Sequence, residues 1–485
     1  MSSQHFFPLT FSFNKRSIIL LSLICLLITQ SSCKKLIDVS PPVTSLTGAS
    51  VFTTDANAIG VLTGLYSGLI SSSNLSTGFI SMSLFPALSA DELSVFGTNA
   101  TYTPYYVNNL NSSANGNIYW NTEYPMLFTI NSAIAEISAT NSLTPAIRQQ
   151  LLGEAKFMRA FCYFYLVNMY GDVPLVTDID YNSNSKLSRT VQAKVFQQII
   201  TDLKDAQGLL SVNYLDASLL KMTSERVRPT KWAAAALLAR AYLYTGDWGN
   251  AEFVSDSIIQ MTSLFKLDSL GGVFLKNHPE AIWQLQPVIS GYNSQAGLFF
   301  TLPTSGPGNS FPVYLNNTLV NSFEAGDMRK QNWTGNVTVA GTTYYYPRKY
   351  KVSTLISPAQ EYETVLRLGE QYLIRSEARA QQNKLTDAIN DLDTIRARAG
   401  LAALNNLSTQ SAVLNAIYHE RQVELFTEWG HRWLDLKRTN TIDAVMGVVT
   451  PQKGGTWNPN WKLYPIPQSE IFANPNLVGH QNAGY

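Results

Sequence analysis

Residues 144–171, which decide the fold, read TPAIRQQLLGEAKFMRAFCYFYLVNMYG. This stretch begins with a capping threonine followed by the proline that helices favour in their first turn, and it ends at a glycine. Between these signals, apolar residues recur every three or four positions, from Leu151 through Met158 and Tyr165 to Met169. The spacing predicts one long helix with a continuous buried stripe along one side.

Two further stretches predict helical hairpins of one design. Residues 230–261 place Leu238, Ala239, Tyr242 and Ala251 at the offsets of the Leu, small, Tyr and Ala positions of a tetratricopeptide unit. Residues 370–399 repeat much of this pattern, with two residues fewer between corresponding positions. Two such hairpins indicate a solenoid-like helical layer. We therefore expect a mainly α fold of tetratricopeptide-like hairpins, an α-α superhelix.

The segment between the two hairpins has a different character. Residues 270–357 are rich in Gly, Pro, Asn and Tyr, with short β-like runs at 281–285 and 337–346. Long irregular loops inside a compact protein are often functional. We expect the helical scaffold to support this irregular, loop-rich region of about residues 270–357, with a few short β-strands, and we expect the region to face a ligand.

The N-terminal residues 1–32 predict an export signal. Lys15 and Arg16 precede an apolar run at 17–28, which is shorter than the roughly 20 residues of a membrane-spanning helix. Ser31 and Ser32 then precede Cys33, as in bacterial lipoprotein signals, where this cysteine is acylated and becomes the mature N-terminus. The sequence predicts a signal peptide at 1–32, lipid attachment at Cys33 and a single mature domain at 33–485. Ordinary signal cleavage nearby is the alternative.

The composition excludes several classes of protein. The 485 residues include 35 Lys+Arg and 34 Asp+Glu, and only 14% of the chain is charged, against about 25% in an ordinary globular protein. Nucleic-acid binding depends on clustered positive charge, so we expect no nucleic-acid partner. The hydrophobic fraction of 45% excludes bulk disorder.

Signatures of catalysis and of metal binding are incomplete or absent. The sequence has no GxSxG elbow, no phosphate loop ending in Gly-Lys and no CxxC pair. His419-Glu420 begins like a zinc-protease motif, but Val423 occupies the place of the second histidine. Glu428-x-x-His431 is half of a di-iron site, and no second Glu-x-x-His follows. We expect no catalytic residue, no cofactor and no metal.

An acidic row recurs near these incomplete motifs. Glu420, Glu424 and Glu428 are spaced every fourth residue, which places them on one side of a helix. The row could form a carboxylate site, but we favour a helix face held to other helices by salt bridges.

Aromatic residues in the irregular loops give the remaining functional signal. Aromatic faces pack against the apolar CH faces of sugar rings, while neighbouring polar groups bind hydroxyls, and such a surface needs no net charge. The adjacent acids of the early loop could contact ligand hydroxyls, or one of them could belong to a glycosidase pair. The candidate ligand-binding residues are Asp91, Glu92, Tyr102, Tyr105, Tyr106, Tyr292, Tyr314, Trp333, Tyr344 and Tyr345.

Several motifs follow one another in a specific order along the whole chain. They are GEAKFMRA at 153–160, YGDVPL at 170–175, ERxxEL at 420–425, RWxDLxR at 432–438, LYPIP at 463–467 and the terminal QNAGY at 481–485. In this order they resemble the SusD-like (RagB/SusD) outer-membrane lipoproteins of Bacteroidetes.

The resemblance implies a non-catalytic cell-surface subunit that captures oligosaccharides or polysaccharides. Its partner would be a SusC-like TonB-dependent transporter, over whose mouth the lipoprotein sits as a lid. The protein would be anchored to the outer membrane by its N-terminal lipid and would face the cell exterior. The motif residues belong to the scaffold, so the family's ligand contacts cannot be transferred by motif. Two alternatives stay open: a capture lid for peptide or another nutrient, and a glycoside hydrolase, which needs two carboxylates about 5 to 10 Å apart.

Overall fold

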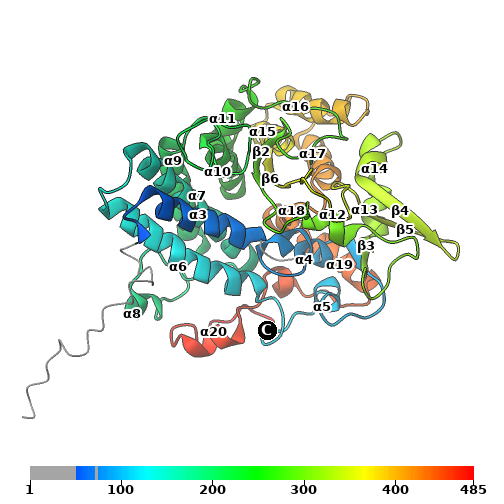
Figure 1. Ribbon diagram of the computed structural model, residues 1–485. Coiled ribbons are helices and arrows are strands. Elements are labelled where there is room, and N and C mark those ends of the chain that lie inside the picture. The colour runs from blue at the N-terminus through cyan, green and yellow to red at the C-terminus, as the bar shows by residue number, and fades with distance from the viewer. Residues whose placement is uncertain (1–50, 71–74) are drawn as a thin grey trace, which may run out of the picture. The chain divides into compact units, whose positions relative to one another are not determined.

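Helix α7 (Pro145–Tyr170) is the centre of the described structure (Figure 1). The computed structural model describes residues 51–70 and 75–485, so the predicted signal peptide and Cys33 lie outside the described residues. Helices α3 (Asp55–Ile70), α6 (Ile118–Ala139) and α9 (Gln192–Leu209) pack against α7. We expected one buried stripe on α7, but every residue from 157 to 170 is buried, because helices cover this part from several sides.

One glycine permits the close approach of α7 and α9. A Cβ atom on Gly153 would lie 2.9 Å from Cγ of Leu210 and 3.0 Å from Cβ of Leu209. Real side chains do not approach each other so closely, so a larger residue at this position would push α9 away from α7.

The two predicted hairpins are confirmed. Helices α10 (Lys231–Thr245) and α11 (Trp248–Ile259) form the first, and α15 (Leu368–Gln381) and α16 (Leu385–Arg398) form the second. Between α10 and α11 the chain reverses at Gly246, whose φ of 73° is left-handed, and the Asp247 carboxylate accepts a hydrogen bond from the Asn250 amide. Helix α11 packs against α15, so the two hairpins stack on each other.

The remaining helices are shorter or lie towards the C-terminus. Helix α17 (Gln410–Glu424) packs on α15 and α16, and it is followed by α18 (His431–Arg438) and α19 (Ile442–Gln452). The short helices are α4 (Phe85–Ser89), α5 (Thr103–Tyr106), α8 (Tyr181–Asn184), α12 (Gln295–Phe300), α13 (Asn317–Ser322), α14 (Met328–Trp333) and α20 (Gln468–Ala473). Within residues 51–70 and 75–485, 3₁₀ turns occur at Phe79–Ser83 and Pro459–Lys462.

Three antiparallel sheets of two strands each occur within the described ranges. They pair β1 (Leu93–Val95) with β3 (Val313–Leu315), β2 (Ala281–Leu285) with β6 (Glu363–Arg367), and β4 (Thr334–Val339) with β5 (Thr342–Pro347). The β-like run at 281–285 is therefore confirmed as a strand. The run at 337–346 is a hairpin, because Ala340 and Gly341 both have positive φ, 49° and 80°, and reverse the chain.

The predicted acidic row is confirmed as a set of salt bridges, but it is buried. Helix α17 ends at Glu424, so Glu428 lies in the turn that follows it. Glu424 has no exposed side-chain surface and binds Arg329, Arg367 and Arg398, which come from α14, β6 and α16. Burial raises the pKa of this carboxyl, but the three guanidinium groups outweigh that effect and hold the pKa well below its usual value. The row therefore ties α17 to three other elements.

Replacing Glu424 by alanine should destabilise the fold strongly. The substitution leaves three buried guanidinium groups without their shared acceptor, and we expect the free energy of unfolding to fall by about 3–5 kcal/mol. Urea denaturation of the purified protein measures this change. The control is Asp205→Ala, which removes a carboxylate that is 46% exposed and pairs with the partly exposed Lys156; it should cost less than about 1 kcal/mol. Equal losses in the two variants would contradict the central role of Glu424.

Candidate functional site

Three aromatic side chains gather at one edge of the irregular region. Phe96 follows β1, Tyr314 lies in β3 and Tyr344 lies in β5. The Tyr344 ring meets Tyr314 edge to face with centroids 5.2 Å apart, and it meets Phe96 at 6.3 Å. We call Phe96, Tyr314 and Tyr344 the aromatic surface. Tyr106, also predicted as a ligand contact, is half-buried, and the Lys453 ammonium lies 5.2 Å from its ring centroid.

The pairing of β1 with β3 directs Tyr314 outward. Val95 pairs with Val313 and Leu93 with Leu315, and all four side chains are buried. Since successive side chains of a strand point to opposite faces, Tyr314 faces away from the core and remains half-buried. Phe96, just beyond the strand, is 43% exposed.

The β4–β5 hairpin holds Tyr344 against this surface. Figure 1 shows the hairpin extending away from the helices. On the strand pair, Gly335 faces Tyr346, and a Cβ on Gly335 would lie 2.3 Å from Cζ of the Tyr346 ring. The ring therefore packs directly on the backbone of β4. Tyr344, two residues before Tyr346, is on the same face and pairs with Val337.

A pocket of about 430 Å³ opens on the segment that joins Phe96 to Tyr106. We call it the amide pocket, because Asn115, Asn117 and Asn121 contribute to its wall together with Thr101 and Thr122. No residue of its lining is charged. Tyr105 and Phe85 add an aromatic part to the wall, with ring centroids 4.1 Å apart. An uncharged pocket of amides, hydroxyls and rings matches the chemistry of a neutral, hydroxyl-rich ligand.

The predicted pair Asp91 and Glu92 lies in the interior, each with 1% exposure. Arg432 donates two hydrogen bonds to Asp91, at 2.8 and 2.7 Å, and the amide of Thr427 donates to Glu92 at 3.2 Å. Burial and the neighbouring Asp91 raise the pKa of Glu92 to about 8. Neither carboxylate offers surface to a ligand, so we assign both to the scaffold. In the sequence, the polar, loop-like surroundings of the pair had indicated that the two carboxylates are exposed.

Trp333 also lies in the core, where it is fully buried. Its indole Nε1 donates to the carbonyl oxygen of Leu270 at 2.9 Å, and the Lys349 ammonium lies 4.9 Å from the ring centroid. A tryptophan with no exposed surface cannot stack on a sugar ring in this structure. We therefore leave Trp333 out of the proposed ligand surface.

The other predicted tyrosines separate into two groups. Tyr102 and Tyr105 are 8% and 3% exposed and pack on Phe85, so they belong to the hydrophobic core. Tyr105 also contributes to the wall of the amide pocket. Tyr292 and Tyr345 are half-buried and stand outside the aromatic surface. Tyr345 points to the opposite face of the hairpin from Tyr344, because the two residues are adjacent on β5.

Sequence reasoning missed Phe96 and the asparagines of the amide pocket. Phe96 precedes Gly97, which has a positive φ of 67° and begins an exposed loop. The position of this aromatic residue, directly before a glycine and a polar loop, could have indicated that its ring is exposed. The asparagines did not stand out, since Asn also occurs in many other loops of this chain.

Within residues 51–70 and 75–485, no group of three or more His, Cys, Asp or Glu side chains is placed to hold a metal ion. No helix in the same ranges combines the length and the apolar character needed to cross a membrane.

Because burial raises the pKa of Glu92, replacing this residue should change how the free energy of unfolding depends on pH. The folded chain binds the Glu92 proton more tightly than the unfolded chain, so Glu92 makes stability fall as pH rises from about 4.5 to about 8. Glu92→Gln removes this penalty, and we expect its free energy of unfolding to exceed that of wild type by on the order of 1 kcal/mol or more at pH 8. At pH 4.5 the difference should nearly vanish.

Denaturation at several pH values measures this effect, and Asp91→Asn is the control. Burial raises the pKa of Asp91, but the ion pair with Arg432 outweighs burial and lowers it, so Asp91→Asn should destabilise the protein above the unfolded pKa. A Glu92→Gln variant that loses stability as pH rises, relative to wild type, would refute the assignment.

Taken together, the geometry defines a class of protein: a helical scaffold that presents a cluster of aromatic rings and an uncharged pocket, with both sequence-predicted acids buried in the interior. Residues 316–485 match a family model described as "SusD family", and residues 71–243 match a second model described as "Starch-binding associating with outer membrane". The chain belongs to the SusD/RagB family, as its motifs indicated.

Individual relatives agree with this assignment. "SusD-like protein P2" of Formosa agariphila is 25% identical to the chain, with 96% of this chain and 99% of that protein aligned. A SusD superfamily structure from Bacteroides vulgatus superposes with a TM-score of 0.76 at 20% identity, covering 89% of this chain and 99% of the other. A structure described as "Laminarin binding SusD-like protein" gives a TM-score of 0.72 at 21% identity, covering 88% and 99%. These likenesses confirm the predicted mainly helical fold class.

Membership also bears on catalysis. Proteins of the SusD family are non-catalytic binding proteins, and a solved relative is described as a "SusD-like carbohydrate binding protein". The prediction that this chain is not an enzyme is therefore confirmed by its family. The buried positions of Asp91 and Glu92 agree with it, since a glycosidase needs two carboxylates that face an open cleft.

Proposed function

We propose that this protein captures oligosaccharides or polysaccharides at the cell surface and passes them to a SusC-like TonB-dependent transporter. The observation that carries the proposal is the aromatic surface, where the Tyr344 ring meets Tyr314 and Phe96 edge to face; an uncharged pocket on the segment that follows Phe96 adds to it. Related structures described as a laminarin-binding protein and as a surface glycan-binding protein support the same ligand class.

The chemistry of the surface suits a glycan. Each sugar ring has an apolar CH face, which aromatic rings cover, and a rim of hydroxyls, which amides and hydroxyls bind. Tyr314 and Tyr344 provide both kinds of contact, because each combines a ring with a hydroxyl group. The amide pocket adds neutral donors and acceptors without any charge that would favour an ionic ligand.

The proposed cellular arrangement follows from the sequence signals and the family. A lipid on Cys33 would anchor the chain in the outer membrane, and the folded part would face the cell exterior as a lid over the transporter's mouth. Support comes from the lipoprotein-like residues before Cys33 and from the family model described as associating with the outer membrane.

Tyr344→Ala should weaken glycan binding by about tenfold or more, since a tenfold loss equals about 1.4 kcal/mol, the scale of a single aromatic contact. Isothermal titration calorimetry against a panel that includes laminarin and starch oligosaccharides measures the change. Tyr345→Ala is the matched control: it removes the neighbouring tyrosine from the opposite face of the same hairpin, and its affinity should equal that of wild type.

Two outcomes would count against the glycan proposal. Equal affinities of the Tyr344→Ala and Tyr345→Ala variants would remove the aromatic surface from the binding site. Absence of binding across the whole glycan panel, together with saturable binding of peptides, would favour the alternative of a peptide-capturing lid.

Cys33→Ala should release the protein from the membrane fraction, because the substitution removes the site of lipid attachment. The measurement is fractionation of cells that express the full chain, followed by detection of the protein in the soluble and membrane pools. Cys162→Ala is the control, since Cys162 is a buried free cysteine of α7. If Cys33→Ala stayed entirely with the membrane after loss of the signal, lipid on Cys33 could not be the anchor.

A further inference from the structure

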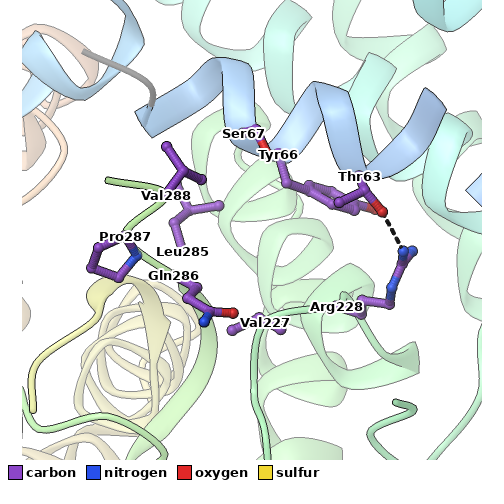
Figure 2. Close-up of a pocket in the computed structure, with 9 residues that line it drawn as sticks. All are labelled: Thr63, Tyr66, Ser67, Val227, Arg228, Leu285, Gln286, Pro287 and Val288. Atoms are coloured by element: carbon purple, nitrogen blue, oxygen red, sulfur yellow. Dashed lines mark hydrogen bonds between the residues drawn. The ribbon is translucent and has the colours of Figure 1, made fainter. Parts of the chain in front are cut away.

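A second pocket, of about 400 Å³, lies between α3, the segment before α10 and the chain that follows β2. We call it the α3 pocket. Figure 2 shows Thr63 and Arg228 at one end and Pro287 and Val288 at the other, with Tyr66 between them. The α3 pocket shares no lining residue with the amide pocket and contains no member of the aromatic surface.

Arg228 is the one charged residue that lines the α3 pocket, and a buried carboxylate neutralises its charge. The Arg228 guanidinium donates to Glu154 at 2.7 Å, and Glu154 also accepts hydrogen bonds from Tyr66 at 2.7 Å and from Gln150 at 3.0 Å. Glu154 has no exposed surface, so it stays with Arg228 when a ligand enters. An anionic ligand would have to compete with this buried carboxylate, and the pocket therefore favours an uncharged ligand.

Several polar groups of the pocket have hydrogen-bonding capacity left for a ligand. Arg228 has five N–H groups, and among the described residues its hydrogen bonds go to Glu154 and to Thr63, the latter at 2.7 Å. The side chains of Ser67 and Gln286 make no hydrogen bond to any residue that the structure describes. A hydroxyl, an amide and a guanidinium edge, all converging on one cavity, are groups that bind the hydroxyls of a ligand.

The opposite wall of the pocket is apolar. Leu285, Pro287 and Val288 line it, and Val288 is 48% exposed at the rim. A ligand with one apolar face and a polar rim fits such an amphipathic lining. The volume of about 400 Å³ is within the range of pockets that enclose small ligands.

We infer that the α3 pocket is a second binding site, which takes a neutral sugar unit, either the end of a glycan chain or a free sugar. Ser67, Arg228 and Gln286 bind its hydroxyls, and Pro287 and Val288 cover its apolar face. The inference deepens the proposed function and rests on it, since the ligand is a sugar of the same class. A second site on other elements would let one protein hold a long glycan at two points.

The test is calorimetric titration of the purified mature protein with glucose and with short oligosaccharides of laminarin and starch. Ser67→Leu fills the pocket from a half-buried position, and Gln286→Ala removes an exposed amide from its rim, so neither change disturbs the core. The control is Ala56→Leu, an exposed residue of the same helix outside the pocket. Thermal unfolding establishes that each variant is folded.

We expect wild type and Ala56→Leu to bind two equivalents of a short oligosaccharide. Ser67→Leu should bind one equivalent, and Gln286→Ala should weaken one of the two equivalents by about fivefold, the effect of one lost hydrogen bond. Tyr344→Ala should weaken the other equivalent by about tenfold or more, and the Ser67→Leu/Tyr344→Ala double variant should retain only that weakened equivalent. Binding of glucose to the α3 pocket, lost in Ser67→Leu, would identify a single sugar as sufficient, whereas binding of oligosaccharides alone would identify a chain end.

The outcomes separate this inference from the proposed function. If Ser67→Leu behaves like Ala56→Leu while Tyr344→Ala weakens binding, the α3 pocket is not a sugar site and the proposed function stands. If Tyr344→Ala binds like wild type and Ser67→Leu loses an equivalent, the α3 pocket is confirmed and the aromatic surface is rejected. Preferential binding of glucuronate-bearing sugars, abolished by Ser67→Leu, would overturn the assignment of a neutral ligand.

Discussion

The buried ion pairs around Glu424 are the interaction on which the rest of the structure depends. This carboxylate binds Arg329 of α14, Arg367 of β6 and Arg398 of α16, so one side chain of α17 connects three other elements. Two of those elements, α14 and β6, belong to or border the irregular region that precedes the second hairpin. Taking charges out of water costs several kcal/mol for each ion, so the arrangement is stable only when every partner is in place.

The same ion pairs attach the hairpin that carries Tyr344 to the helical scaffold. Helix α14 is followed directly by β4, the first strand of the hairpin that carries Tyr344. Arg329 therefore fixes the base of that hairpin to the helical scaffold through Glu420 and Glu424. Much of the small number of charges in this chain is used internally in this way, which leaves neutral amides and aromatic rings at the aromatic surface and the amide pocket.

The sequence predicted the scaffold well and the site poorly, for one physical reason. Helical periodicity and capping are local, so the helices of the two hairpins could be recognised from residues close together in sequence. Exposure is not local. Trp333 and Tyr344 both lie in the same aromatic-rich segment, yet one is fully buried and the other is half-exposed on a hairpin. Likewise, Asp91 is held in the interior by partners that are distant in sequence, Arg432 and Gln422.

The sequence by itself determined the helical hairpins, the acidic row as a set of salt bridges, and the family. Those conclusions depend on spacing and motif order. Tertiary structure alone decided which aromatic residues form a surface, because Phe96, Tyr314 and Tyr344 come from segments more than 200 residues apart at the extremes and meet only through strand pairing and hairpin packing. It alone also decided the α3 pocket, where residues of α3, the segment before α10 and the chain after β2 converge.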